Sequence, residues 1–307
     1  MWKKAVKMLL FFTIAWLAAF ALLIGGAMLF NLRTPSNTRL ASSAHLDNPP
    51  APLKKPVVLK IVTFNIWDMY IGSRWRNVRM PAIAETLAEL EPDIAGLQES
   101  FIAADRERIF RRLAEAGLPH HRYFRSGVAG SGLSVISRFP IEEAVFRRYA
   151  KGGKPHKLWH GDWWAGKGVC LTRLKLPGQA GYIDFFNTHA HAGYRDDRYN
   201  AVRASNMADC ARFITEAATG TSPAFVVGDF NTYDGEPQYQ SLVEGAKLQR
   251  VMAIDTHIDH VFAVSSEHYA FEVLDTVPIK AELADGEDAF GLSDHTGYMS
   301  TVRVTPR

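Results

Sequence analysis

The chain has 307 residues, of which 47% are hydrophobic and 22% charged, and its formal net charge is +3. This composition excludes an intrinsically disordered protein, and a content of two cysteines excludes a disulfide scaffold. The positive excess comes from Lys3, Lys4 and Lys7, because the other 32 basic residues balance the 32 acidic ones. Since nucleic-acid-binding proteins carry their cationic surplus in the folded domain, that class is disfavoured.

The N-terminal region contains an uncharged run over residues 8–30. As a helix this run would be about 35 Å long, which is enough to cross a hydrocarbon core of about 30 Å. The alternative is a cleaved signal peptide, whose apolar part is usually shorter, about 7–15 residues. We therefore predict one uncleaved transmembrane helix. The lysines before it favour a cytoplasmic N-terminus, with the bulk of the chain on the extracytoplasmic side.

Residues 31–56 contain five prolines among Ser, Asn and Ala, a composition typical of an irregular, semi-extended tether. The chain is thus expected to divide into a membrane anchor over residues 1–30, a linker over residues 31–56 and a compact domain over residues 57–307. Cys170 and Cys210 lack metal-ligand spacing, and we expect both to be small buried side chains.

The compact domain shows helices and strands in mixed order. Apolar residues at helical spacing predict helices over residues 76–90, 101–116 and 198–217. Short apolar or β-branched runs predict strands over residues 57–66, 94–98, 133–137, 141–149, 168–176, 181–187, 224–227, 257–264, 269–274 and 298–304. Because helices separate the early strands and strand-rich stretches follow, the pattern predicts an α/β sandwich.

Several of these strands run directly into polar residues. The strand ends are followed by Asn65, by Gln98 and Glu99, by residues 187–191, by Asp229 and Asn231, and by residues 293–295. Sites in α/β sheets often lie just beyond strand ends. A single residue of this kind is more often a turn residue, but five termini with complementary chemistry are not explained by turns alone.

The chemistry of this set indicates a metal-assisted reaction at phosphorus. Carboxylates and amides are oxygen ligands of the type that Mg²⁺ prefers, and one or two carboxylates suffice. Histidines can act as a base or as a phosphate ligand. The sequence contains no Cys/His cluster typical of zinc and no Gly-x-Ser-x-Gly elbow typical of a serine hydrolase. The set therefore favours hydrolysis of a phosphate ester.

The ordered termini resemble the endonuclease/exonuclease/phosphatase superfamily, and the resemblance covers residues 57–307. It implies a four-layer α/β sandwich, with two packed mixed sheets flanked by helices, and Mg²⁺-dependent cleavage of phosphodiesters, with Mn²⁺ as an alternative cation. Residues 124–127, 130–133, 160–163, 166–169 and 188–192 are similar to neutral sphingomyelinases. Those enzymes are phospholipases C that split sphingomyelin into ceramide and phosphocholine.

The resemblance implies a metal site and a catalytic base. Glu99, Asn65 and Asp294 would hold the Mg²⁺ ion, and a carboxylate at the end of a buried strand is costly unless it is paired or metal-bound. His295 would be the general base that takes a proton from the attacking water, with Asp259 orienting its ring. The expected reaction is a single in-line displacement at phosphorus, without a covalent enzyme intermediate.

The resemblance also implies contacts to the substrate phosphate. His189 and Asn231 would donate hydrogen bonds to the phosphate oxygens, where negative charge builds up in the transition state. Asp229 would position the water or His189. Lys167 and His191 are further candidates for contacts to the phosphate.

Two features of residues 159–167 have open interpretations. The family uses an Asp/Lys pair similar to Asp162 and Lys167 as a switch near the site, whereas the alternative is an exposed loop ion pair of small energetic value. Trp159, Trp163 and Trp164 favour a loop that faces the membrane, because tryptophan prefers the lipid–water interface. The alternative is a loop packed on the core.

Three hypotheses for function remain. The first is a membrane-anchored phospholipase C of the sphingomyelinase type, with a phospholipid in the bilayer as its substrate. The second is a nuclease or inositol-phosphate phosphatase of the same superfamily. A nuclease would be expected to have a basic groove, whereas residues 61–307 contain 27 basic and 31 acidic residues. The third is a catalytically inactive membrane-bound binding protein, which the intact set of polar residues disfavours. We expect no nucleic-acid ligand, and nothing in the sequence indicates a protein partner.

Charge is unevenly distributed within the domain. Residues 101–160 contain 12 basic and 5 acidic side chains, so the rest of the domain is acidic. A basic side next to a lipid site would draw the domain toward anionic headgroups. Sphingomyelin, lyso-phosphocholine lipids and inositol phosphosphingolipids all remain candidate substrates.

Overall fold

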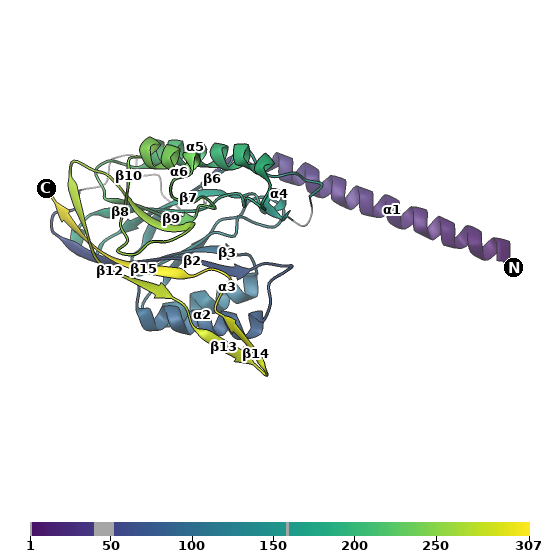
Figure 1. The fold of residues 1–307 in the computed structure, drawn as a ribbon, viewed down its shortest axis with the longest axis horizontal. Coiled ribbons are helices and arrows are strands. Elements are labelled where there is room, and N and C mark those ends of the chain that lie inside the picture. Colours follow the sequence, from purple (N-terminus) through teal and green to yellow (C-terminus); the bar gives the residue numbers. More distant parts are fainter. Residues whose placement is uncertain (1, 40–51, 158–159) are drawn as a thin grey trace.

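Two β-sheets pack face to face in the computed structural model, which describes residues 2–39, 52–157 and 160–307 (Figure 1). The first sheet has the strand order β1-β6-β7-β8-β9-β11-β10, and the second has the order β12-β15-β2-β3-β5-β4. The strands of the first sheet are β1 (Asn37–Arg39), β6 (Ile141–Arg148), β7 (Gly168–Lys175), β8 (Tyr182–His189), β9 (Ala224–Asp229), β10 (Leu248–Arg250) and β11 (Asp259–Val264). The strands of the second are β2 (Val57–Asp68), β3 (Ile94–Ser100), β4 (His120–Tyr123), β5 (Ser134–Ser137), β12 (Tyr269–Ile279) and β15 (Gly297–Pro306).

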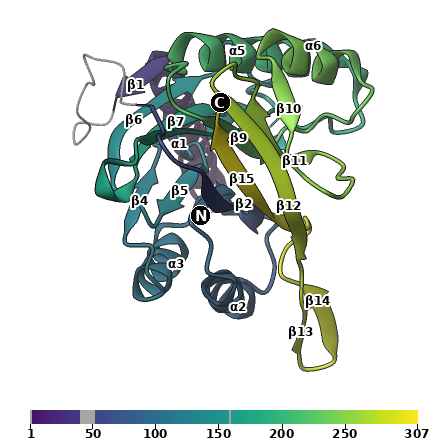
Figure 2. The same ribbon diagram turned by 90° about the vertical axis from the view of Figure 1, so that its left-hand side faces the viewer.

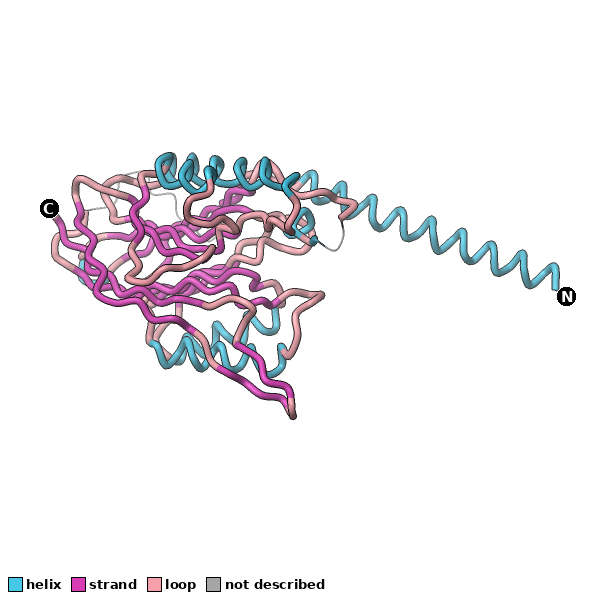
Figure 3. The backbone as a smooth tube through the Cα atoms, in the orientation of Figure 1, coloured by secondary structure: helices cyan, strands magenta, loops and turns pink. Residues whose placement is uncertain are grey.

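Helices cover the outer faces of both sheets, so the molecule has four layers (Figures 1 and 3). The helices are α1 (Trp2–Arg33), α2 (Arg76–Leu90), α3 (Ala103–Glu115), α4 (Asp162–Ala165), α5 (Asn200–Ala217) and α6 (Pro237–Gly245). Helices α2 and α3 lie on the second sheet, and α5 and α6 lie on the first (Figure 2). The predicted four-layer α/β sandwich is confirmed.

Side-chain alternation along the strands builds three hydrophobic layers from one sequence pattern. In β2, Leu59 and Ile61 are buried between the sheets, whereas Val62 and Phe64 are buried under α2 and α3. In β8, Phe185 faces the other sheet and Phe186 faces α5. Because successive side chains of a strand point to opposite faces, strands buried on both faces are apolar throughout.

The predicted elements agree with the structure in the core and differ at the periphery. The helix expected over residues 76–90 has those bounds, and the other predicted helices and strands are present with small shifts at their ends. The sequence reading missed β4, β10, α6 and the hairpin of β13 (Glu282–Asp285) with β14 (Asp288–Gly291). The hairpin is mostly exposed, so burial leaves no apolar pattern in its sequence.

The expected linker departs from an irregular tether at both of its ends. Residues 31–33 continue α1, and Asn37–Arg39 forms β1, which pairs antiparallel with β6. Leu53 is buried in the core between the sheets, and its amide donates a hydrogen bond to the Tyr269 hydroxyl. The division of the chain at residues 30 and 56 stays a prediction. Cys170 and Cys210 are buried and unpaired, as expected.

Helix α1 extends away from the sandwich (Figure 1). Its apolar side chains are exposed, and its best 18-residue window has a mean hydropathy of 2.4. In the part of the chain that the structure describes, it is the one helix long and apolar enough to cross a membrane. Length and composition alone do not separate a span from a signal sequence at this position.

Candidate active site

Strand pairing brings the predicted polar residues to one edge of the sandwich. In the first sheet, His189 of β8 lies opposite Asp229 of the parallel strand β9, and Asp229 lies opposite Asp259 of the antiparallel strand β11. In the second sheet, β15 runs antiparallel to β2, so the loop before β15 meets the end of β2. This loop carries His295, and the end of β2 carries Asn65.

The pleat explains why these side chains point between the sheets. Val227 of β9 and Val261 of β11 belong to the core between the sheets, and each lies two residues from its strand's terminal Asp. Side chains two apart on a strand share a face, so Asp229 and Asp259 also point inward. The apolar core therefore continues directly into a polar site at the strand ends.

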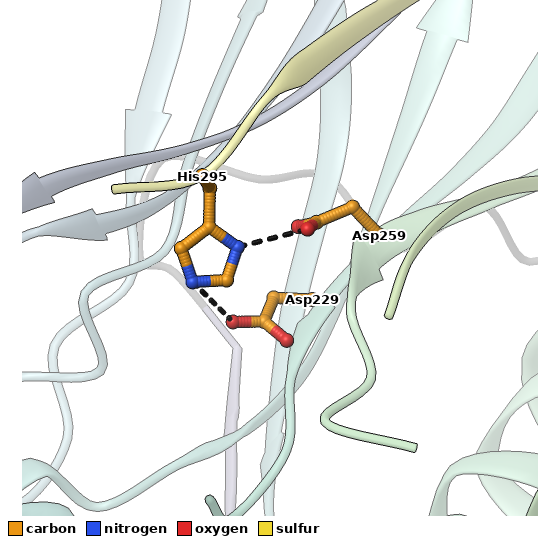
Figure 4. Close-up of side chains that lie close together, drawn as sticks. All are labelled: Asp229, Asp259 and His295. Atoms are coloured by element: carbon orange, nitrogen blue, oxygen red, sulfur yellow. Dashed lines mark hydrogen bonds and ion pairs between the residues drawn. The ribbon is translucent and has the colours of Figure 1, made fainter. Parts of the chain in front are cut away.

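His295 lies between two aspartates (Figure 4). Its Nδ1 is 2.8 Å from Oδ2 of Asp259, and its Nε2 is 3.7 Å from Oδ2 of Asp229. Burial alone would lower the pKa of His295, but the hydrogen bond to Asp259 and the charges of Asp229 and Asp294 raise it above the usual value. The Asp259 contact fixes the ring so that Nε2 is the nitrogen free to take a proton.

Asn65 connects the two sheets at the site. Its Nδ2 donates a hydrogen bond of 3.0 Å to Oδ2 of Asp229 and lies 3.5 Å from Nε2 of His295. Ser293 adds a second connection, because its Oγ donates to the carbonyl oxygen of Asn65 at 2.7 Å and accepts from the amide of His295 at 3.2 Å. The loop that carries His295 is therefore anchored to the end of β2.

Glu99 is turned into the site by a bulge. The register between β2 and β3 shifts after Asn65, and Glu99 has a φ of 55°. Regular alternation would point its side chain the same way as Leu97, under the helices, whereas the left-handed backbone redirects it. Its Oε1 lies 4.0 Å from Nε2 of His189 on the other sheet. Such backbone strain in a polar site indicates a functional constraint.

The surroundings of Glu99 fit a bound cation. Burial raises the pKa of Glu99 to about 7, although the charge of Lys167 opposes this shift. Its Oε2 is buried and has no hydrogen-bond partner. A desolvated carboxylate oxygen without a donor is suited to a hard divalent ion. The carboxylate of Asp229 belongs to the same site, whereas Oδ1 of Asn65 accepts a hydrogen bond from the backbone amide of Trp67 at 3.1 Å.

Three other carboxylates, those of Asp229, Asp259 and Asp294, are further candidate metal ligands. Asp229, Asp259 and His295 present ligand atoms within 4.8 Å of one another. We favour the predicted ligand Glu99 over this set, because Asp259 already holds Nδ1 of His295. Asp294 is exposed, and its Oδ1 accepts from the Ser293 hydroxyl at 3.3 Å. The ligand roles of Glu99, Asn65 and Asp294 stay predictions.

Asp162 and Lys167 form a buried ion pair that reaches the site, so an exposed loop pair is excluded. Lys167 Nζ lies 2.8 Å from Oδ1 of Asp162 and 2.8 Å from Nε2 of His189, and it donates to the carbonyl oxygen of Ala190. Burial and the charge of Lys167 hold the pKa of His189 well below its usual value. His189 is therefore neutral, and its Nε2 also lies 3.3 Å from Oδ2 of Asp229.

Asn231 follows β9 with a φ of 48°. Its backbone nitrogen donates to Oδ1 of Asp229, and its side-chain Nδ2 donates to the carbonyl oxygen of Ala190 at 3.0 Å. The side chain thus lies beside His189 at the same edge, where the sequence places a phosphate contact. That role stays a prediction.

His191 lies farther along the same loop. It is buried, with Nδ1 2.6 Å from the carbonyl oxygen of Ala192 and 3.5 Å from Oδ2 of Asp162. Among the described residues, its polar contacts do not include Asp229 or His295. The structure therefore does not bring His191 into the central cluster, and its expected phosphate contact stays a prediction.

Of the three tryptophans, Trp159 lies outside the described residues. Trp163 and Trp164 are half-buried, and the Trp163 carbonyl oxygen accepts a hydrogen bond from Asn31 at the end of α1. The segment is thus packed against the base of the N-terminal helix. A membrane contact by this segment stays a prediction.

The sequence reading missed Arg79. It is fully buried in α2, and its guanidinium donates hydrogen bonds to the carbonyl oxygens of Arg74, Ile66, Trp67 and Leu292 and to the hydroxyl of Ser73. These contacts join the end of β2 to the loop that carries His295. Arginine on a helix next to a partly exposed arginine such as Arg76 carries no signal of burial, so the sequence alone could not reveal the role of Arg79.

Comparison with known proteins identifies the family. The model of the endonuclease/exonuclease/phosphatase family matches residues 62–295. The chain belongs to the endonuclease/exonuclease/phosphatase family. The match includes Asn65, Glu99, His189, Asp229 and His295, the residues that the strand ends bring together.

Two similar proteins carry names that refer to sphingolipid hydrolysis. A Drosophila melanogaster protein named as a neutral sphingomyelinase is 31% identical over 80% of this chain and 61% of its own length. An inositol phosphosphingolipids phospholipase C of Schizosaccharomyces pombe is 35% identical over 58% of this chain and 42% of its own. The chain thus spans less than two thirds of these relatives.

A solved structure of the same architecture contains magnesium. It is a double mutant of beta toxin from Staphylococcus aureus with bound magnesium ions, which matches with a TM-score of 0.59 and 15% identity. The match covers 82% of this chain and 100% of that one. At this identity the likeness supports the family fold.

Proposed function

We propose that this protein is a Mg²⁺-dependent phosphodiesterase of the sphingomyelinase type, which releases the phosphorylated headgroup of a membrane phospholipid. The observation that carries the proposal is His295, held by Asp259 at Nδ1 with Nε2 directed to a site shared with Asn65 and Asp229. The names of the relatives supply the substrate class.

The proposed reaction is a single displacement at phosphorus, in which water replaces the lipid oxygen. The water oxygen forms a bond to phosphorus while the bond from phosphorus to the lipid oxygen breaks. The water proton passes to Nε2 of His295, and the departing lipid oxygen takes a proton from the solvent to give the alcohol. Asp259 stabilises the imidazolium that forms, and the polar groups at the strand ends stabilise the charged phosphate.

Glu99 and Asn65 would hold the cation in this proposal, with Mg²⁺ preferred and Mn²⁺ as a substitute. When bound, the ion would neutralise charge on the phosphate oxygens. The raised pKa of His295 gives a second reason to expect it. A base must be neutral, and a nearby cation opposes the effect of Asp229 and Asp294 on the imidazole.

A cavity lined in part by Asn231 suggests which lipid headgroup the site accepts. Its volume is about 370 Å³, and its lining includes Tyr194, Tyr233 and Asp197. The lining also includes Arg195, and Arg203 with Glu236, which form an ion pair with each other at 2.9 Å. Both tyrosines are exposed. Aromatic faces with carboxylates favour a quaternary ammonium group over a neutral polyol, so phosphocholine lipids are the proposed substrates.

The membrane location completes the proposal. Helix α1 would cross the bilayer with the N-terminus in the cytoplasm and the sandwich on the extracytoplasmic side. Protease protection in sealed vesicles tests this orientation. Protection of the sandwich in vesicles whose lumen is the extracytoplasmic side supports this orientation. Protection in vesicles whose lumen is the cytoplasmic side argues against it.

The decisive test is headgroup release from mixed micelles of sphingomyelin, lyso-phosphatidylcholine or inositol phosphosphingolipid, with Mg²⁺ or with EDTA. We expect release from the phosphocholine lipids that EDTA abolishes and that His295→Ala lowers by about 10²–10⁴-fold. His268→Ala, at an exposed histidine, is the matched control. Equal release by the His295 variant overturns the mechanism, and plasmid cleavage without lipid turnover overturns the substrate class.

A further inference from the structure

The loop between β2 and α2 exposes two large apolar side chains. Tyr70 and Ile71 are 62% and 80% exposed, and Gly72 beside them has a φ of 91°, which suits a tight turn. Outside α1, Ile71 is the most exposed large hydrophobic side chain among the described residues. A single exposed apolar residue is normal, but two in sequence at a loop tip form a local apolar surface. Such a surface indicates a contact with another molecule or with a membrane.

Contacts on both sides of the tip hold this loop in place. The Tyr70 hydroxyl donates to the carbonyl oxygen of Phe101 at 3.3 Å, and the two ring centroids are 6.3 Å apart. On the other side, Ser73 Oγ donates to the carbonyl oxygen of Trp67 at 2.6 Å and accepts from Arg79 at 2.7 Å. The loop is thus part of the folded structure, and its fixed backbone directs Ile71 outward.

The loop and the base of α1 lie at the same edge of the sandwich. The loop follows the end of β2 that carries Asn65 and the site. At the base of α1, Nδ2 of Asn31 donates to the carbonyl oxygen of Trp163 at 2.8 Å. The segment of Trp163 leads into β7, whose first residue Gly168 lies opposite His189 of the site. Figure 1 shows α1 and the loop after β2 extending beyond the same end of the sandwich.

The charges next to the loop favour an apolar contact over an electrostatic one. Arg76 is paired with both Asp68 and Asp105, and Arg108 lies 3.5 Å from Asp105. Arg74 is exposed and adds a further cation. Because carboxylates already balance two of these three arginines, burial of the apolar tip is the main driving force. A tyrosine beside an aliphatic residue suits the boundary between headgroups and hydrocarbon, where tyrosine is enriched.

We propose that Tyr70 and Ile71 form a second membrane contact, which inserts at the headgroup–hydrocarbon boundary of the bilayer that α1 crosses. A helix can tilt within a bilayer, so α1 alone does not fix the distance between the site and the lipids. A second attachment, on the sheet opposite the base of α1, holds the strand ends with Asn65 and His189 against the lipid surface. The proposal rests on the membrane location proposed for α1 and not on the hydrolytic activity.

The test places nitroxide spin labels on the full chain in vesicles of dioleoyl phosphatidylcholine with EDTA, so that no lipid is consumed. Cys170 and Cys210 are buried, so an introduced cysteine is the one that reacts. The control is Val58→Cys, at a half-exposed residue near the opposite end of β2. A water-soluble nickel chelate should reach the label at Ile71→Cys at least about fivefold less than the control label, because ions are excluded from hydrocarbon. Equal access at the two positions overturns the proposal.

A second label reports on the native side chain of Ile71. Asn77 is exposed in the first turn of α2, next to the loop, and a label at Asn77→Cys should be partly shielded from the chelate by the bilayer. Adding Ile71→Asp should remove this shielding, because a carboxylate is costly to bury in hydrocarbon. Adding Val58→Asp should leave the shielding unchanged. Shielding that survives Ile71→Asp overturns the role of the loop.

A label at Leu17→Cys, in the middle of α1, separates failure of the loop contact from failure of the anchor. Lipid at residue 17 with water at residue 71 overturns the loop contact alone, whereas water at both positions overturns the anchor and the contact together. Dipolar broadening at residue 71 that disappears on dilution with unlabelled chains would show contact between copies and overturn the lipid assignment. Loss of shielding at about 1 M salt would indicate electrostatic attraction and overturn the apolar assignment. Headgroup release is measured separately, so failure of the hydrolytic function leaves these results interpretable.

Discussion

Lys167 places its ammonium nitrogen 2.8 Å from Nε2 of His189. Because a protonated lysine can only donate, Nε2 is the acceptor, and the neutral imidazole carries its proton on Nδ1. His189 can therefore donate from Nε2 to a phosphate only after Lys167 has moved away. In the arrangement seen here Lys167 is the donor on this side of the site, and its ammonium is paired with Asp162.

The Asp162–Lys167 pair should contribute strongly to stability, because both side chains are less than a tenth exposed. We expect Lys167→Met to lower the free energy of unfolding by about 3–5 kcal/mol, since it leaves Asp162 buried without its counterion. Adding Asp162→Asn should recover most of that loss. Urea unfolding of the two single variants and the double variant in detergent gives the coupling energy.

The exposed pair of Arg303 and Glu272 is the control for this cycle, with a coupling energy below about 1 kcal/mol. Additive effects of the two substitutions at Asp162 and Lys167 would show that the pair is not a coupled unit, and the switch hypothesis would lose its physical basis.

Metal binding should change the pH dependence of turnover. Without a cation, Asp259, Asp229 and Asp294 outweigh the effect of burial and raise the pKa of His295, so the base is protonated at neutral pH. A cation at Glu99 opposes this shift and favours the neutral imidazole. The acidic limb of the profile of kcat against pH should therefore move to lower pH as Mg²⁺ is raised. A limb that does not respond to Mg²⁺ below saturation would place the ion away from His295.

Arg79 should be a positioning residue for the base. Its guanidinium joins Ile66 and Trp67 at the end of β2 to Leu292, which precedes the loop with His295. Arg79→Lys keeps the charge but cannot reproduce the planar set of donors, and it should cost about 2–4 kcal/mol of unfolding free energy.

The same variant should lower kcat more than it raises KM, because the displaced loop carries the base and the substrate contacts lie on the other sheet. Arg112→Lys, at an exposed ion pair with Glu85, should change stability by less than about 0.5 kcal/mol. Wild-type kinetics in Arg79→Lys, despite the loss of stability, would limit this residue to a structural role.

The sequence predicted the strand ends but not what holds them in place. The strand ends at Asp229 and at Asn65 can each be recognised from an apolar run followed by a polar residue. The pairing of strands then brings these two residues to one site. The φ of 55° at Glu99 and the inward turn of its carboxylate arise from a register shift between β2 and β3. That shift depends on contacts distant in sequence, as do the buried contacts of Arg79. Local periodicity contains neither.

The structure of residues 37–39 also differs from the prediction because it depends on contacts distant in sequence. Proline and serine content predicts a tether over residues 31–56, because composition reports local preference. Three residues of that segment nevertheless pair with β6, where register places Asn37 opposite Arg147. A short edge strand gains its stability from the neighbouring strand and not from its own residues.

His260 should make the folded state sensitive to acid. It is fully buried among Phe230, Tyr239 and Phe262, and burial lowers its pKa to about 4. The unfolded chain protonates this histidine below its ordinary value of about 6.5, so the unfolded state binds more protons between these two values. The stability contributed by the neutral side chain is complete above about pH 6.5 and is lost as the pH falls toward 4. At pH 5 the expected loss from this residue is about 2 kcal/mol.

Urea unfolding of the full chain in detergent at pH 7.5 and pH 5 measures this effect. His260→Gln cannot titrate, so its stability should fall about 2 kcal/mol less than that of the wild type over the same interval. His268→Gln removes an exposed histidine and should follow the wild-type curve. Other buried groups such as His189 contribute equally to all three proteins, which is why the difference between variants is the informative quantity. An identical pH dependence in wild type and His260→Gln would mean that the pKa of this histidine is the same in the folded and unfolded states.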